Sequence, residues 1–532
     1  MKTITNIIYP AFALLAYACF ALSPTAQAQL SPPPDGGYPN ENTAEGTDAL
    51  FSLTTGANNT AVGNQALYSN TDGTGNSAFG FHALRSNTGA NNTATGGSAL
   101  ESNTTGAANT ANGVQSLYNN TEGSANVANG LFALQSNTTG NNNTATGTGA
   151  LQGNIDGGGN TANGFNALLS NTTGSVNTAT GANALLSNTT GTDNVAVGFA
   201  ALFNNIEGGT NVANGNYALF SNTTGQDNTA IGFAALGNST TTIQNIAIGS
   251  FALFSNTTGN FNTATGDSAL VTNTTGENNN AYGVQALYSN TTGGHNMAYG
   301  VNTLYSNTTG FANIGIGSYA LFNNTTGNEN VTLGLGAGQN LTTGNNNIII
   351  GSQVFGVAGE SKTIRIGKVG TQTATYIAGI MGKVSPRGIP VFINSNGQLG
   401  TATSSERFKD GIKPMDKASE AILALKPVTF RYKKELDPDG APQFGLVAEE
   451  VEKVNPDLVV RDADGKVYTV HYEAVNAMLL NEFLKEHRTV QEQQKEIDAL
   501  RAELKGQRAL IQKVSDKVEL DKPAPQTVLN NQ

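Results

Sequence analysis

The sequence predicts a mainly β protein: a long β-solenoid, a short β connector, and a small α+β domain that ends in a long coiled-coil helix. Three observations lead to this prediction. An Ala-Leu pair returns every 17 residues through more than half of the chain. A different, more charged composition begins after about residue 350. Apolar residues then recur every seven residues near the end of the chain, which is typical of a coiled coil.

The first 28 residues have the pattern of a secretory signal peptide. Lys2 supplies a short positive region, residues 7–22 are apolar, and an Ala-Gln-Ala triplet ends at residue 28. A retained membrane anchor is the alternative, and prolines within and after the apolar stretch disfavour it. We therefore expect a secreted or cell-surface protein in which residues 29–42 form a linker. The one cysteine, Cys19, would leave with the signal peptide, so the mature chain would lack disulfides and thiol chemistry.

Residues 43–345 repeat a unit of the form N-T-A-x-G-x-x-A-L-x-S-N-T-T-G-x-x, of which about eighteen copies fit. The N-T-A-x-G part suits a strand, and S-N-T-T-G is turn chemistry. The Ala-Leu pair is the constant apolar element, so we expect it to face the inside of each coil. Stacked Asn and Thr would form hydrogen-bonded ladders along a shaft on the order of 85 Å. The pattern leaves open whether the Ala-Leu segment is a second strand or one helical turn.

These repeats loosely resemble the head repeats of trimeric surface adhesins, which form parallel β-rolls, although the period here is longer. Disorder is the alternative, because the segment is polar and low in complexity. The strict register of the Ala-Leu pair argues for the solenoid, since a disordered spacer has no need of it.

Charge restricts the partners that the chain can have. The net charge is −11, and all but two of the 27 Lys and Arg residues lie after Gly351. We therefore expect no nucleic-acid partner, because phosphate binding needs a basic face. No cofactor or metal site is predicted either. The sparse acidic residues of the shaft form no recurring pair, which disfavours an enzyme acting on polysaccharide.

Residues 346–403 predict a connector of short strands. Ile348-Ile349-Ile350 and the T-I-R-I run at 363–366 are expected as short strands, and an Asn-Gly turn at 396–397 joins two apolar runs into a hairpin. These strands have little core of their own, so we interpret them as part of a multi-chain stalk.

A serine and a lysine five residues apart, Ser404 and Lys409, open the charged part of the chain. A serine is a weak nucleophile unless a base takes its proton, and a lysine can be that base where its surroundings lower its pKa. From the residues alone, other interpretations stay open. Thr403 and Glu406 have capping-box spacing, which predicts an ordinary helix start. Ser405 is a rival nucleophile.

The S-S-E-R-F-K segment at 404–409 is similar to the S-D-x-R-L-K signature of self-cleaving chaperone domains. These domains lie at the C-termini of phage endosialidase tail spikes and related fibres. They form family seventy-four of the serine peptidases, and a membrane-bound myelin transcription factor contains the same domain. P-V-T-F-R-Y at 427–432 and F-G-L-V-A-E-E-V at 444–451 also match the family. The resemblance spans about residues 404–490.

The resemblance implies a domain over 404–475 that trimerises the chain and cuts it once, with no external substrate. Carried onto this sequence, Ser404 would be the nucleophile, Lys409 its general base, and Thr403–Ser404 the scissile bond. The chain departs from the family at Ser405, where Asp is frequent, and at Phe408, where Leu is frequent. The first departure removes a carboxylate beside the expected nucleophile.

Residues 476–520 predict a coiled coil, followed by a tail at 521–532. The seam residues are Phe483, Val490, Ile497, Leu504, Ile511 and Val518, alternating with Leu479, Glu486, Gln493, Leu500, Gln507 and Val514. Gln in the seam is compatible with three strands. We therefore expect a homotrimeric exported fibre with an extracellular or surface ligand that the sequence does not identify. An uncleaved structural adhesin is one alternative, and a prophage tail fibre is another, which the signal peptide disfavours.

Overall fold

The computed structural model describes residues 38–521, apart from 379, 381–384, 386, 395–396 and 463. The predicted signal peptide, most of the linker and nearly all of the tail lie outside the described residues. The chain divides into two compact units that meet between Thr373 and Ala374, and each is described by itself.

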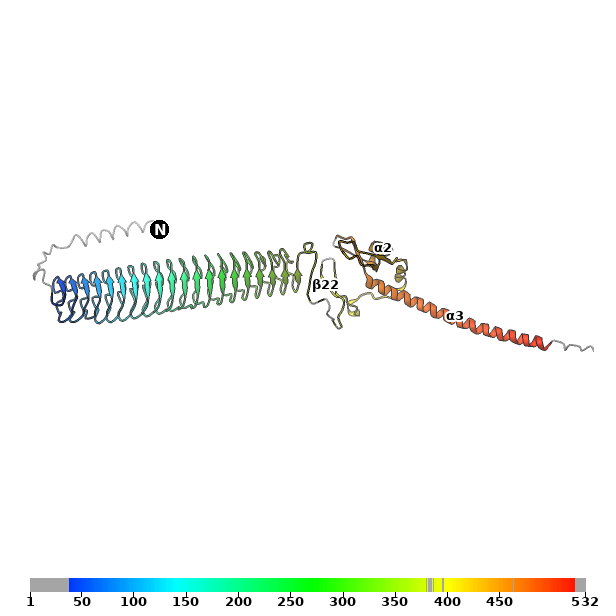
Figure 1. The fold of residues 1–532 in the computed structure, drawn as a ribbon, viewed down its shortest axis with the longest axis horizontal. Helices are drawn as coiled ribbons and strands as arrows, with labels where there is room; N and C mark the ends of the chain where they lie inside the picture. The colour runs from blue at the N-terminus through cyan, green and yellow to red at the C-terminus, as the bar shows by residue number, and fades with distance from the viewer. Residues whose placement is uncertain are drawn as a thin grey trace, which may run out of the picture. The chain divides into compact units, whose positions relative to one another are not determined.

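The first unit is a β-solenoid, as predicted. Its 20 strands form one parallel sheet, and each strand pairs with the equivalent residues of the next repeat, as Thr161 does with Thr178. Figure 1 shows them as a row of parallel arrows from blue to green. The strands are β1 (Thr43–Glu45), β2 (Thr60–Val62), β3 (Ser77–Phe79), β4 (Thr93–Thr95), β5 (Thr110–Asn112), β6 (Val127–Asn129), β7 (Thr144–Thr146), β8 (Thr161–Asn163), β9 (Thr178–Thr180), β10 (Val195–Val197), β11 (Val212–Asn214), β12 (Thr229–Ile231), β13 (Ile246–Ile248), β14 (Thr263–Thr265), β15 (Asn280–Tyr282), β16 (Met297–Tyr299), β17 (Ile314–Ile316), β18 (Val331–Leu333), β19 (Ile348–Ile350) and β20 (Ile364–Ile366).

The core of each coil is small and apolar. The central Ala of the strand and the Ala-Leu pair are fully buried, as at Ala162, Ala167 and Leu168. The Ala-Leu segment is neither strand nor helix; it is a run of turns. The Leu has a left-handed backbone, with φ 54° at Leu168, and its N–H still donates to the next coil, to the carbonyl of Ala184 at 3.0 Å. Burial of the Leu side chain and this hydrogen bond offset an unfavourable backbone conformation.

Two columns of buried asparagines join the coils, which confirms the predicted ladders. In the first column, the backbone N–H of Asn109 donates to Asn92 Oδ1 at 2.9 Å, and Asn109 Nδ2 donates to the Gly123 carbonyl at 2.8 Å. In the second, which lies in the turn, Asn120 Nδ2 donates to Asn103 Oδ1 at 2.7 Å. Because an interior polar group is favourable only when it is hydrogen-bonded, each Asn specifies the register of its neighbours.

Ser239 interrupts the second column within the shaft. It stands where most coils have Asn, and it leaves Asn222 Oδ1 without a hydrogen-bond partner, as Asn70 Oδ1 also is next to the 16-residue coil. Thr242 replaces the glycine three residues later and bonds to Ser239. The two changes belong together, because a Cβ at the equivalent Gly225 would lie 2.3 Å from Asn222 Oδ1 in its own coil.

We expect Ser239→Asn alone to destabilise the solenoid, since the new side chain would collide with Thr242. Ser239→Asn together with Thr242→Gly should instead restore the column and give a coupling energy of roughly 2 kcal/mol. The coupling energy is measured in a double-mutant cycle, by guanidinium unfolding of the parent, Ser239→Asn, Thr242→Gly and the double variant. Additive effects would contradict the coupling.

The sheet continues two strands past residue 345, where the repeat pattern ends, and finishes in a charged layer. Arg365 takes the central position of β20, opposite Ile349. It donates to Glu360 through Nε at 3.0 Å and Nη2 at 2.6 Å. Partial burial acts to raise the pKa of Glu360, but hydrogen bonds from Arg365 and from the backbone of Val357 outweigh it and lower that pKa. This ion pair closes the apolar interior, as the terminal repeat of a solenoid must.

The second unit contains small antiparallel sheets and a long helix. Its elements are β21 (Phe392–Ile393), β22 (Leu399–Gly400), the 3₁₀ helices η1 (Glu406–Phe408) and η2 (Asp416–Ala424), β23 (Val428–Phe430), β24 (Gln443–Gly445), α2 (Ala448–Val454), η3 (Pro456–Leu458), β25 (Val459–Arg461), β26 (Val467–Val470) and α3 (Tyr472–Leu520). The pairs are β21–β22, β23–β24 and β25–β26. No helix in the described part of the chain is long and apolar enough to span a membrane.

Candidate functional site

The predicted catalytic residues lie on either side of a single 3₁₀ turn. Ser404 precedes η1 by two residues, and Lys409 follows η1 in extended backbone, where its N–H donates to the Glu406 carbonyl at 2.9 Å. Both side chains are exposed. No hydrogen bond joins Ser404 and Lys409, both of which are described residues. The single chain therefore presents the two groups to solvent without bringing them together.

The alternative interpretation, a capped helix start, also has no hydrogen bond to support it. The N-cap of η1 is Ser405, and its side chain makes no capping bond. The guanidinium of Arg407 lies 4.6 Å from the ring centre of Phe408, which is itself 61% exposed. Phe408 stands where the related domains often have Leu, so the position stays apolar but is uncovered in one chain.

A small core joins α2, η3, β25 and β26 to α3. Five buried side chains form it: Val451, Leu458, Val459, Val470 and Met478. The Leu446 N–H donates to the hydroxyl of Tyr472 at 3.2 Å, which fastens the end of β24 to the first turn of α3. A five-residue core is small for a domain of this length, because burial of apolar surface must offset the lost chain entropy.

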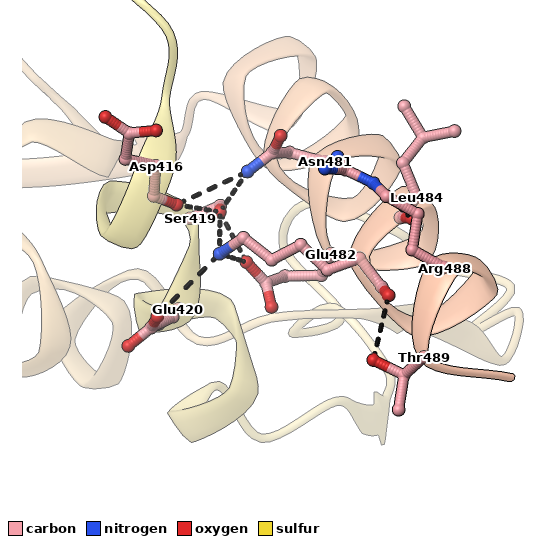
Figure 2. A network of polar contacts seen from close by, with 9 residues as sticks. Asp416, Ser419, Glu420, Asn481, Glu482, Leu484, Arg488 and Thr489 are labelled. Atoms are coloured by element: carbon pink, nitrogen blue, oxygen red, sulfur yellow. Dashed lines mark hydrogen bonds and ion pairs between the residues drawn. The ribbon is translucent and has the colours of Figure 1, made fainter. Parts of the chain in front are cut away.

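A buried polar cluster joins η2 to α3, and no pattern in the sequence indicates it. Ser419 is fully buried; its hydroxyl donates to Glu482 and accepts from Asn481 Nδ2 at 2.7 Å and from Lys485 Nζ at 3.3 Å. Lys485 Nζ also lies 2.6 Å from Glu482 and 3.7 Å from Glu420. Figure 2 shows these side chains converging on Ser419 from the two helices. Ser419 and Lys485 are separated by 66 residues, so no local pattern could have linked them.

This second serine–lysine pair is structural. Lys485 donates to the Ser419 oxygen and is ion-paired with Glu482, so it serves the serine as a hydrogen-bond donor and not as a base. No substrate carbonyl can reach a fully buried hydroxyl. The cluster fixes the angle at which α3 leaves the domain.

Acid should loosen this cluster. The hydrogen bond from Lys485, with that from Ser419, lowers the pKa of Glu482 below its ordinary value of 4.5. A carboxyl group whose pKa is lowered by folding stabilises the folded state when the pH is above its ordinary pKa. This stabilisation is lost as the pH falls through the folded-state pKa. We expect Glu482→Gln to lower the thermal unfolding midpoint of the second unit at pH 7, and the difference from the parent to shrink in acid, below the ordinary pKa of 4.5.

The matched control for this prediction is Glu492→Gln, an exposed glutamate of α3 with no hydrogen bond or ion pair. It should leave the midpoint unchanged at pH 7 and in acid. An equal loss in both variants would assign the effect to helix charge rather than to the cluster.

The seam of α3 is uncovered in the single chain. All the apolar seam residues are exposed, from Leu479 at 57% and Phe483 at 64% to Val518 at 59%. Phe444 at 83% and Tyr468 at 74% add exposed aromatic surface on β24 and β26. Apolar residues at heptad spacing that remain exposed are the surface of a helix that pairs with other helices.

Residues 404–460 match the family model described as chaperone of endosialidase. No curated protein and no solved structure matches the chain. The matched residues begin at Ser404 and include η1, both strands of the β23–β24 pair and α2. After its long β-solenoid, this chain carries a chaperone-of-endosialidase domain.

Proposed function

We propose that this chain is an exported fibre protein whose C-terminal domain assembles three copies and then cuts itself off between Thr403 and Ser404. The observation that carries the proposal is the position of the family match. It starts at Ser404, the residue that would become the first of the released fragment, and the 20-strand shaft precedes it. The domain would hold three chains in register while the slow, non-local β pairing of the shaft is completed.

The cleavage chemistry follows from the position of the nucleophile. Ser404 Oγ attacks the carbonyl carbon of Thr403, the residue before it, through a five-membered ring. The hydroxyl proton passes to the Lys409 amine, which returns it to the peptide nitrogen as that nitrogen leaves to become the new amino group of Ser404. Water then hydrolyses the resulting ester, so that Thr403 gains a carboxylate and Ser404 recovers its hydroxyl. One turnover leaves two chains.

Oligomerisation would complete the active site. A lysine serves as a base only where burial or neighbouring cations lower its pKa. Lys409, Phe408 and Ile412 are all exposed in one chain. Packing of neighbouring copies against these residues would desolvate the amine and bring it to Ser404. Cleavage would then await assembly, which is the order that a temporary chaperone requires.

The intact mass of the purified protein tests the proposal. We expect two fragments split at Thr403–Ser404 in the parent, and one uncut chain in Ser404→Ala and in Lys409→Ala, with at least about a hundredfold loss of rate. Ser405→Ala separates the rival nucleophile and should still cleave. Lys413→Ala, an exposed lysine four residues further on, is the matched control and should cleave normally.

Three results would argue against parts of the proposal. A full-length chain in every sample would exclude autoproteolysis and leave a structural trimeric fibre. Cleavage in Ser404→Ala but not in Ser405→Ala would move the nucleophile by one residue. Retention of residues 1–28 in the exported protein, again read from the mass, would exclude removal of a signal peptide.

A further inference from the structure

The outer face of the solenoid sheet changes character halfway along the shaft. In each three-residue strand the central residue points into the coil, and the first and third residues lie on the outer face. In β1–β9 only three of these 18 outer positions are apolar: Val62, Phe79 and Val127. In β10–β20, 17 of 22 are Val, Ile, Leu, Met or Tyr. The repeat unit is otherwise the same, so coil folding does not require the change.

The apolar positions form two continuous columns. From β16 to β20 all ten outer residues are apolar, and the pairing register sets Met297, Ile314, Val331, Ile348 and Ile364 in one column and Tyr299, Ile316, Leu333, Ile350 and Ile366 in the other. Ile248 is 38% exposed, Ile316 40% and Leu333 47%. Contiguous exposed apolar surface of this kind marks a surface that is covered in the assembled protein.

We infer that the outer face of β10–β20 is an interface with further copies of this chain, packed in parallel and in register about a common axis. This inference rests on the proposed homotrimer and says where the shafts meet. The N-terminal nine coils, with Thr and Asn on the same face, would remain solvated on all sides.

Three features favour a second copy over another occupant. A second copy has the same coil spacing, so apolar rows meet apolar rows along the whole face, which an unrelated surface would not match. None of the 22 outer positions in β10–β20 is charged, so identical faces meet without repulsion. Eleven strands at about 4.7 Å, each about 10 Å wide, give roughly 500 Å² before flanking side chains are added. This is the order of a stable interface, about 800 Å² per partner.

The rise in apolar residues along the shaft also determines the relative orientation of the packed copies. Apolar density rises toward β20, the end of the shaft that leads in sequence into the domain carrying the exposed α3 seam. Copies joined through parallel α3 helices would bring equivalent coils together, dense end to dense end. An antiparallel pair would set β20 of one copy against the polar coils of the other.

Cysteine cross-linking in the full-length chain tests this inference. In a Cys19→Ser background, Ile316→Cys places a thiol in the apolar columns, and Thr146→Cys places one at the same strand position of β7 in the polar half. A short bismaleimide should join Ile316→Cys chains to each other and leave Thr146→Cys chains unjoined. Under native conditions, maleimide labelling should be slow in the Ile316→Cys variant and fast in the Thr146→Cys variant.

Light scattering on the same samples separates this inference from the proposed function. An oligomeric chain in which both thiols label freely and neither cross-links would overturn the inference and leave the trimer intact. A shielded thiol at 316 without cross-links would mean that a different occupant covers the face. Equal cross-linking at both sites would mean that the whole shaft packs, and the gradient would carry no meaning. A monomeric chain would overturn the trimer and the inference together.

Discussion

Ile497→Asp combined with Leu504→Asp should abolish both assembly and cleavage. These residues occupy two layers of the α3 seam one heptad apart and are 43% and 52% exposed in the single chain. If the seam buries them, each substitution removes roughly 1.5–3 kcal/mol of apolar burial per chain and adds a carboxylate to a desolvated layer. Light scattering should then report a monomer. The mass should show an uncut chain, because the residues that would desolvate Lys409 belong to neighbouring copies.

The matched control is Ala502→Asp combined with Ala509→Asp. These alanines are also seven residues apart on α3, but they lie on the face opposite the seam. The control carries the same added charge and a similar loss of helix propensity, and it should stay oligomeric and cleave. Cleavage of the monomeric seam variant would show that one chain assembles the site alone. A cleaving oligomer in both variants would mean that α3 does not hold the copies together.

The sequence was sufficient for the solenoid because its constraints repeat. Ala and Leu recur in register, and Asn recurs where a buried amide must bond to the next coil, so each copy confirms the others. It was not sufficient for the backbone path. The left-handed conformation of Leu168 and its equivalents runs against the preference of any bulky residue, and only hydrogen bonding between coils makes it favourable. The last two strands of the shaft could not be predicted either, because Ile349 and Arg365 do not resemble the alanines that occupy the same position in the other strands.

The sequence was enough to predict which residues form the candidate site, but not how those residues are arranged in space. The S-S-E-R-F-K segment located Ser404 and Lys409, while the single chain leaves both exposed and apart. If neighbouring copies complete the site, as proposed above, their contribution has no signature within one sequence. The Ser419 cluster lay outside prediction for a different reason. Its partners on α3 are more than sixty residues away, and a serine between Ala418 and Glu420 gives no sign of what it will contact.

Gly96→Ala should disrupt the shaft, whereas Gly97→Ala should leave it intact. Gly96 has a φ of 135°, and a Cβ there would lie 2.6 Å from the Gly113 carbonyl oxygen of the next coil. Both the backbone strain and the collision oppose the substitution, because the facing atoms are backbone that is fixed by the ladder. We expect a loss of roughly 3 kcal/mol or more. Gly97 follows directly, has open space around its Cα and has no left-handed φ, so alanine there should be neutral or stabilising by about 0.5 kcal/mol.

The position of this pair in the shaft makes the readout local. Each coil of a solenoid is stabilised only by its neighbours, so a strained coil weakens the coupling between the coils on its two sides. Guanidinium unfolding of Gly96→Ala should show an earlier or split transition, and limited proteolysis should cut near residue 96. The Gly97→Ala variant should retain the parent profile. Equal behaviour of the two variants would show that the coils tolerate a Cβ at the corner, and that the glycine after each strand serves the spacing of the repeat rather than the close approach of the coils.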